Sequence, residues 1–187
     1  MDAERQTDDE TGRYAGFAIW AAVTGAREDA DRPASIRSVA EGAAVTLDVV
    51  TEDTVRVICR LVVAPEQARF VAPNAVSLAQ AMFAPNAWYR AVAADGVPVG
   101  FLMLAEDAES ATYVLWRFMI DARHQGKGYG RAAIRLLLDH VRSLPGATEL
   151  RTSWVAAPGG PEPFYLGIGF QPTGEVDEGE VVGRIAL

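Results

Sequence analysis

The sequence has very little cysteine and histidine. Cys59 is the single cysteine in 187 residues, so no disulfide can form within the chain. His124 and His140 are the two histidines, too few with one cysteine for a zinc site of the usual kind. We therefore expect no bound metal. Cys59 lies in an apolar helical run, where we expect a small buried hydrophobic side chain and no nucleophile.

Positive charge and long apolar runs are also scarce. The chain has 17 basic and 25 acidic residues, a formal net charge of −8, which argues against a nucleic-acid surface. No apolar run approaches the ~20 residues that a membrane helix needs. The first residues, MDAERQTDDE, are acidic and do not resemble a signal peptide. We expect a cytoplasmic protein with neither a membrane nor a nucleic-acid partner.

The chain changes character near residue 45. Residues 1–44 are polar and loop-like around a short apolar segment, Tyr14–Thr24, and we predict a partly flexible N-terminal extension. Residues 45–187 carry the hydrophobic periodicities of one folded domain.

The periodicities of this domain predict four helices and a sheet. The predicted elements are a strand at Val45–Val50, a helix after Thr51, a loop at Ala64–Asn74, a helix at Ser77–Phe83, strands at Trp88–Ala94 and Val97–Ala105 around an Asp95-Gly96 hairpin turn, a strand at Tyr113–Ile120 with the helix after it, a strand at Thr148–Val155, a short helix at Pro161–Ile168, and two strands from Phe170 onward. One strand–helix–strand crossover stands among antiparallel hairpins. This order predicts an α/β (α+β) fold with a mixed, mostly antiparallel central sheet flanked by about four helices.

The stretch from Tyr113 to Arg142 has the clearest chemistry. A strand rich in aromatic and β-branched residues leads into the glycine turn Gln125–Gly130, and an amphipathic helix follows. The first helical turn leaves backbone N–H groups unpaired, and the helix dipole adds partial positive charge there. This arrangement predicts an anion site, with phosphate as its usual ligand.

Two common phosphate-binding loops do not fit this turn. A Walker loop needs Ser or Thr after its lysine, but Lys127 is followed by glycine. A dinucleotide loop needs G-x-G-x-x-G, but after Gly126 and Gly128 the third glycine, Gly130, comes one position early. A nucleotide-binding domain is therefore disfavoured.

A third pattern, Q/R-x-x-G-x-G/A, fits Gln125–Gly130. In this the chain resembles acetyl-coenzyme A-dependent N-acetyltransferases of the GNAT superfamily, whose turn of this type binds pyrophosphate. Phe118–Asp121 is similar to the superfamily's L-x-V-x-P strand, with Ala122 where proline is frequent. Pro163–Phe170 resembles the late F-Y-x-x-x-G-F segment, and the element order from Val45 also resembles the GNAT order. The runs LWRFMID and QGKGYG, with Phe70–Asn74 upstream, are more narrowly similar to bacterial diamine (spermine/spermidine) N-acetyltransferases.

The resemblance implies an enzyme that transfers an acetyl group from acetyl-CoA to a primary amine by direct attack in a ternary complex. A small-molecule amine is the expected acceptor, with a polyamine as the narrower expectation, and a homodimer is expected. Tyr165 matches the family tyrosine that protonates the coenzyme A sulfur. The residues expected to bind the cofactor are Met119, Ile120, Gln125, Gly126, Lys127, Gly128, Tyr129, Gly130 and Arg131, with Lys127 in a supporting role.

The acceptor site and the general base are less determined by the sequence. Gln67, Phe70, Asn74 and Glu178 are the expected acceptor-binding residues, because the early loop and the last hairpin should border the cleft. The candidates for the base are Glu106, Asp107, Asp121, Glu178 and Glu180. Trp116 is predicted to be core, Arg117 to need a carboxylate or carbonyl partner, and His124 to be exposed. An aminoglycoside, an amino acid or a protein N-terminus remains an alternative acceptor, and a binding module without turnover an alternative function.

Overall fold

The computed structural model describes residues 43–187. The apolar segment predicted at Tyr14–Thr24 and nearly all of the predicted N-terminal extension lie outside these residues. The elements are β1 (Val45–Asp48), α1 (Glu52–Arg60), the 3-10 helix η2 (Pro65–Gln67), α2 (Asn74–Ala81), β2 (Ala87–Ala94), β3 (Val97–Asp107), β4 (Thr112–Ile120), the 3-10 helix η3 (Ala122–His124), α3 (Tyr129–Arg142), β5 (Glu149–Trp154), α4 (Glu162–Ile168), β6 (Gln171–Asp177) and β7 (Glu180–Ala186).

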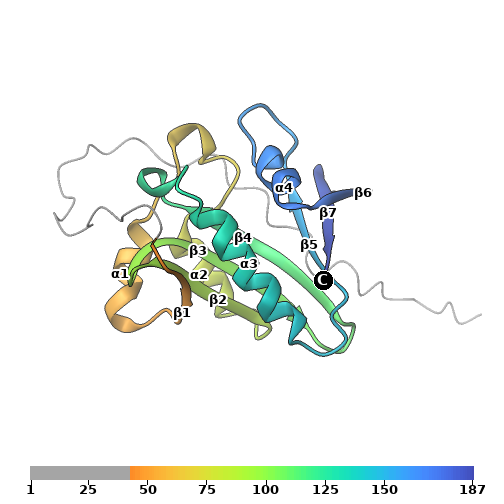
Figure 1. The fold of residues 1–187 in the computed structure, drawn as a ribbon, viewed down its shortest axis with the longest axis horizontal. Helices are drawn as coiled ribbons and strands as arrows, with labels where there is room; N and C mark the ends of the chain where they lie inside the picture. Colours follow the sequence, from red (N-terminus) through yellow and green to blue (C-terminus); the bar gives the residue numbers. More distant parts are fainter. Residues whose placement is uncertain (1–42) are drawn as a thin grey trace, which may run out of the picture.

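One seven-stranded sheet organises the described residues, in the order β1-β2-β3-β4-β5-β7-β6 (Figure 1). Every neighbouring pair is antiparallel except β4 and β5, which are parallel because α3 connects them as a crossover. The predicted mixed, mostly antiparallel sheet with four α-helices is confirmed. The predicted Asp95-Gly96 hairpin is confirmed too, with φ of 48° and 75° at its two residues.

The start of α1 agrees with the prediction, whereas the bounds of α2 differ from it. Helix α1 begins after Thr51 as predicted, and the backbone N–H of Thr51 donates to Oγ1 of Thr54 at 2.9 Å. Helix α2 was predicted at Ser77–Phe83 but begins at Asn74 and ends at Ala81. The amide side chain of Asn74 donates to the carbonyl of Ile58, which anchors the start of α2 to the end of α1.

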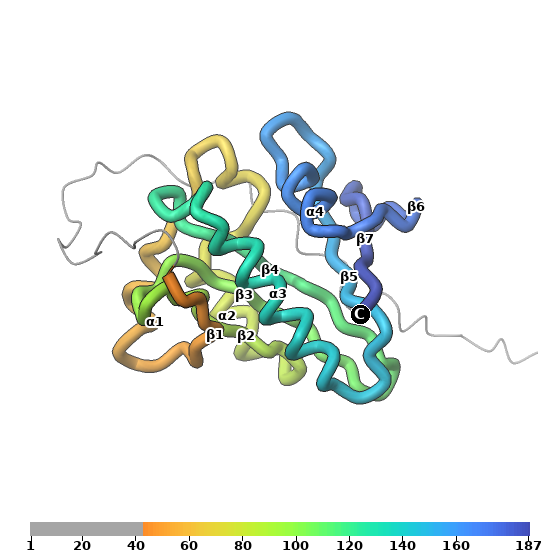
Figure 2. Tube along the Cα trace, in the orientation of Figure 1, coloured from red at the N-terminus to blue at the C-terminus, as the bar shows by residue number. Residues whose placement is uncertain are grey.

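The sheet separates two hydrophobic clusters because successive side chains of a strand point to opposite faces. Leu102 and Leu104 of β3 pack with the apolar side of α3, which crosses one face of the sheet (Figure 2). Phe101 and Met103 pack instead with Ile58 of α1 and with the partly buried residues of α2. Trp116, which was predicted to be core, is only partly buried, against this second cluster. None of the helices in residues 43–187 is long and apolar enough to cross a membrane.

Strand β4 is irregular along both of its edges. A register shift against β3, between Met103 and Leu104, leaves Trp116 as an extra residue, which is a β-bulge. On its other edge β4 pairs with β5 at two positions, Val114 with Arg151 and Leu115 with Thr152. Residues 116–120 of β4 therefore run on without a β5 partner. The backbone of this half-strand is open on the β5 side.

Gly100 holds the end of this half-strand against β3, and we predict that Gly100→Ala destabilises the fold. An added Cβ would lie 2.5 Å from the carbonyl oxygen of Met119 and 2.6 Å from Cδ1 of Ile120. Overpacking of this kind costs about 1–3 kcal/mol of unfolding free energy. Urea denaturation measures the loss.

The matched control is Gly167→Ala in α4. The nearest atom to its added Cβ is a terminal nitrogen of Arg131 at 3.8 Å, an ordinary contact. Because alanine favours a helix over glycine, this variant should be unchanged or more stable. Equal losses in both variants would contradict the tight packing at Gly100.

Candidate functional site

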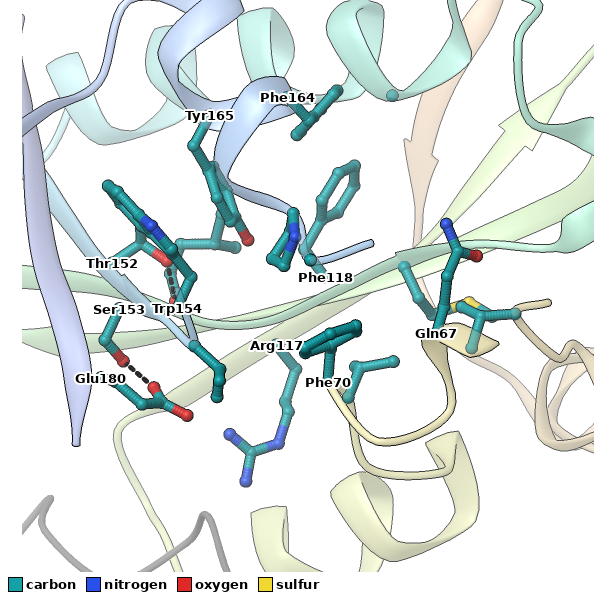
Figure 3. A pocket seen from close by; sticks show the side chains of 18 of the residues that line it. Gln67, Phe70, Arg117, Phe118, Thr152, Ser153, Trp154, Phe164, Tyr165 and Glu180 are labelled. Atoms are coloured by element: carbon teal, nitrogen blue, oxygen red, sulfur yellow. Dashed lines mark hydrogen bonds between the residues drawn. The ribbon is translucent and has the colours of Figure 1, made fainter. Parts of the chain in front are cut away.

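A cavity of about 940 Å³ lies where β4 and β5 separate. Its walls come from the open half of β4, the segment between η2 and α2, the turn before α3, helix α4, and the β6–β7 hairpin (Figure 3). Segments that are far apart in the sequence therefore meet here. The divergence of two parallel strands creates the space, and the surrounding loops supply its chemistry.

One end of the cavity is formed by the glycine turn. Gly126 and Gly128 have φ of 75° and 83°, and a Cβ on either would meet no atom within 4 Å. Gly128 is the N-cap of α3, so the turn opens this helix as the sequence predicts. Left-handed glycines bring backbone N–H groups to the surface of the cavity with no side chain in front of them. The turn is therefore shaped to receive an anion of phosphate size.

The side chain of Gln125 fixes this turn to its surroundings. Its Nε2 donates to the carbonyl of Ile120 and to Oε1 of Gln67, both at 2.9 Å. Gln67 also accepts from the backbone N–H of Ala64 at 3.2 Å. The glutamine pair thus connects the turn and the end of β4 to the 3-10 helix η2, which ends at Gln67.

The other residues expected at the cofactor site have different relations to the cavity. Met119, Ile120, Tyr129, Gly130 and Arg131 line it, whereas Lys127 does not. Gly130 lies where α3 meets α4, and a Cβ there would be 3.2 Å from the ring of Phe164. The close approach of α3 to the ring of Phe164 therefore favours a residue without a side chain at position 130.

Tyr165 comes to the cavity from α4 and is 6% exposed. Its ring stacks on Trp154 with centroids 5.3 Å apart and meets the edges of Phe164 and Phe170. The hydroxyl points into the cavity (Figure 3). The aromatic cage holds one orientation of the phenol beside the point where β4 and β5 separate.

Burial raises the pKa of Tyr165 to about 12, although its hydrogen bond with Thr152 acts in the opposite direction. The negative charge of Glu180 raises this pKa further. Thr152 also donates from Oγ1 to the carbonyl of Leu115 at 3.1 Å, across the last pair of the parallel ladder. The phenol is therefore protonated at neutral pH and is placed by a threonine at the fork.

The expected acceptor-binding residues separate into two groups. Gln67, Phe70 and Glu178 line the cavity. Asn74 does not line the cavity, because its buried side-chain amide donates hydrogen bonds to the carbonyl of Ile58 and the sulfur of Met119. Its position supports a structural role, and the prediction for Asn74 as an acceptor ligand is corrected accordingly.

Three of the five candidate bases lie away from the cavity. Glu106 contacts His140 at 2.8 Å, and Asp107 accepts from the backbone of the β3–β4 turn, whose amides lower its pKa. Asp121 is fully buried and accepts from Arg123 at 2.8 Å and from the backbone of Val62. Each carboxylate has a local structural partner, which removes all three from the list of candidates.

Glu178 and Glu180 remain, and both line the cavity from the β6–β7 hairpin. Glu180 accepts a hydrogen bond from Ser153 Oγ at 2.5 Å (Figure 3). Its negative charge acts to raise the pKa values of both Tyr165 and Arg117, and all three side chains line the same cavity. No such relation is found for Glu178, which lies in the exposed turn with φ of 46°.

Two predictions about burial were wrong. His124 is 3% exposed, not exposed as predicted, because η3 turns it inward beside the cavity. Burial lowers its pKa, and neither ring nitrogen has a hydrogen-bond partner within residues 43–187. Cys59 is partly exposed where burial was expected, since Ile58 is the residue of α1 that faces the core.

Several cavity residues were missed by sequence reasoning. Thr152 and Ser153 lie in a strand that was predicted, but nothing in the sequence says where β5 meets β4. Phe118 and Phe164 stack on the cavity wall with their ring centroids 5.7 Å apart. Both lie in segments that carry the family resemblance, but the sequence did not indicate that they meet. Within residues 43–187 no three histidine, cysteine or acidic side chains gather as a metal site would require.

Comparison with known proteins adds independent findings. A model of the Acetyltransferase (GNAT) family matches residues 72–170. A spermine/spermidine N(1)-acetyltransferase of Bacillus subtilis is 30% identical over 143 residues, covering 71% of this chain and 91% of the relative.

Two solved structures illustrate the similarity of fold. The PaiA N-acetyltransferase of Thermoplasma acidophilum, solved with coenzyme A, has a TM-score of 0.56 at 13% identity and covers 77% of this chain and 99% of its own. A SpeG spermidine N-acetyltransferase mutant of Vibrio cholerae has a TM-score of 0.57 at 17% identity. The match covers 76% of this chain and 93% of the SpeG chain. With the family match and the curated relative in agreement with this fold, the chain belongs to the GNAT family of N-acetyltransferases.

Proposed function

We propose that the protein transfers the acetyl group of acetyl-CoA to a primary amine of a small molecule, by direct attack in a ternary complex. One observation carries this proposal: a single cavity joins the glycine turn, the open half of β4 and the hydroxyl of Tyr165. An anion site, an extended run of free backbone and an acid would then lie along one path. A long thioester that carries phosphate groups could bind its phosphates at the first, its chain along the second and its sulfur beside the third.

The donor would bind along β4 and the turn. The backbone N–H groups from Gln125 to Arg131 would hold the pyrophosphate, and the backbone of Met119 and Ile120, which has no β5 partner, would pair with the pantetheine arm. The empty space above Gly126 and Gly128 fits this role. The structure of the Thermoplasma relative with coenzyme A supports it by family likeness. Lys127 stays a prediction of lesser weight, because it lies outside the cavity lining.

Tyr165 is the proposed general acid. The neutral amine attacks the thioester carbonyl to form a tetrahedral oxyanion, and collapse of this intermediate breaks the carbon–sulfur bond and leaves a thiolate. The phenol would give its proton to that sulfur, with Thr152 orienting the hydroxyl. Glu180 is the proposed base, acting on the acceptor ammonium directly or through water, since it lines the same cavity as Tyr165.

A polyamine is the first acceptor class to test. The curated relative that supports it acts, by its name, on spermine and spermidine. The β6–β7 hairpin adds acidic residues to the cavity wall, among them Asp177, Glu178 and Glu180, which suit a cationic ligand. An aminoglycoside, an amino acid and a protein N-terminus stay open as acceptors. A homodimer and a cytoplasmic location also stay predictions.

We predict that Gly128→Ala weakens acetyl-CoA binding. Alanine at φ of 83° costs about 1–2 kcal/mol, and its methyl group would stand in front of the backbone donors. Calorimetry should show Kd raised by about tenfold or more.

Gly96→Ala is the matched control for this variant. Gly96 has φ of 75° in the β2–β3 turn, with no atom within 4 Å of an added Cβ, and it does not line the cavity. It should lose similar stability and bind acetyl-CoA as the wild type does. No binding by the wild-type protein would refute the proposed donor.

Tyr165→Phe should lower kcat by about 10²–10⁴-fold, the usual effect of losing a general acid, while acetyl-CoA binding is retained. Single-turnover kinetics and calorimetry separate the two effects. Tyr113→Phe is the control, because this buried tyrosine donates to the carbonyl of Pro145 at 2.6 Å and does not line the cavity. Unchanged behaviour of Tyr165→Phe would favour a binding module without turnover.

The raised pKa of Tyr165 also predicts a pH profile. A phenol with a pKa of about 12 keeps its proton at any lower pH, so its ionisation does not lower the rate below that value. The acceptor reacts as the neutral amine, so kcat/KM for the acceptor should rise between about pH 6 and 9.5 without an alkaline decline. A wild-type decline in this range that Tyr165→Phe lacks would contradict the assignment.

A further inference from the structure

Arg117 is a cation in the cavity wall that the reaction described above does not use. It follows the bulged residue Trp116 on β4, and its guanidinium lies over the indole ring at 5.2 Å. One terminal nitrogen donates to the carbonyl of Trp116 at 2.8 Å, and the other reaches Oε1 of Gln80 at 3.4 Å, a long contact. In Figure 3 the Arg117 side chain passes between Phe70 and Glu180, and its guanidinium points away from Tyr165.

The guanidinium of Arg117 is incompletely satisfied. Its Nε is buried and has no hydrogen-bond partner within residues 43–187, and no carboxylate of this part of the chain forms an ion pair with it. More exposed arginines do have such pairs: Arg123 with Asp121, and Arg142 with Asp139. A buried cation without an anionic partner is costly, so this site is suited to an anion that residues 43–187 do not supply.

Glu180 does not fill this role. It lies on the same cavity, and its charge partly offsets the lowering of the Arg117 pKa by burial, but the two groups do not reach ion-pair distance. The carboxylate of Glu180 instead holds the hydroxyl of Ser153. The cavity lining thus includes a guanidinium, that of Arg117, and a carboxylate, that of Glu180, which form no ion pair with each other.

We propose that the acceptor is an amino acid, whose carboxylate is bound by Arg117 while its reacting amine faces Glu180. The planar guanidinium, through its terminal nitrogens, matches the two oxygens of a carboxylate. An amino acid with a second amine also agrees with the acidic hairpin and with a relative that acts on compounds of several amines. This inference rests on the acetyltransferase function proposed above.

A polyamine carries no anionic group. Bound in the same place, it would supply no anion to Arg117 and would bring a second cation near this one. The two acceptor classes can therefore be separated by compounds that differ in the carboxylate alone. Lysine and cadaverine form such a pair, and ornithine and putrescine form another.

The experiment measures kcat/KM of the full chain for each pair at saturating acetyl-CoA, by release of the free thiol. The wild type should prefer lysine or ornithine over its decarboxylated partner by at least about tenfold, the size of one charge-assisted hydrogen bond. Arg117→Met should abolish this preference, mainly through KM of the acceptor. Arg117→Lys should keep part of it, because the charge is retained and the fork is lost.

Arg90→Met is a matched control. Arg90 donates to the carbonyl of the preceding Tyr89 and lies over Trp88 at 4.2 Å, so its setting on β2 copies that of Arg117 outside the cavity. This variant should keep the wild-type preference. Calorimetry with acetyl-CoA verifies that each variant is folded.

Each other outcome overturns the inference. If cadaverine, putrescine or spermidine is acetylated as well as or better than the amino acids, the proposed acetyltransferase function stands. The inference that the acceptor carries a carboxylate is then wrong. If the Arg117→Met variant still prefers lysine over cadaverine, Arg117 is not the cause of the preference. If neither pair is acetylated while acetyl-CoA binds, the amino-acid acceptor is wrong. If acetyl-CoA does not bind, the proposed function fails as well.

Discussion

The separation of β4 from β5 after two paired positions is the constraint on which the rest of the site depends. Continued pairing would satisfy the backbone of residues 116–120 and fill the cavity with sheet. Because buried backbone groups need partners, a half-strand left open beside a cavity is a place for a ligand that can hydrogen-bond as a strand does. The hydrogen bond from Thr152 to Leu115 stands at this fork, and the same threonine contacts the hydroxyl of Tyr165.

The two ends of the cavity serve different tasks. The donor end is built from backbone: left-handed glycines and the start of α3, held to β4 and the opposite wall by the amide of Gln125. The acceptor end is built from side chains, among them Arg117 and Glu180. A backbone site suits a cofactor that many proteins share, whereas side chains can change the acceptor without disturbing the donor.

Sequence reasoning succeeded where the information is local. The glycine spacing, the periodicity of α3 and the Asp95-Gly96 turn each predict structure from neighbouring residues, and all three were confirmed. It failed where long-range packing decides. His124 was predicted to be exposed and is buried, and Asn74 was assigned to the acceptor but anchors α2 to α1. The β4–β5 fork could not be located, since its position depends on the register of strands whose paired residues are 37 apart in the chain.

A structure of the protein with coenzyme A bound tests the central claim most directly. The account predicts the pyrophosphate on the backbone between Gln125 and Arg131, the pantetheine arm paired with the open edge of β4, and the sulfur within hydrogen-bonding reach of the Tyr165 hydroxyl. A coenzyme bound elsewhere on the molecule would contradict the account. So would one whose thiol lies far from Tyr165.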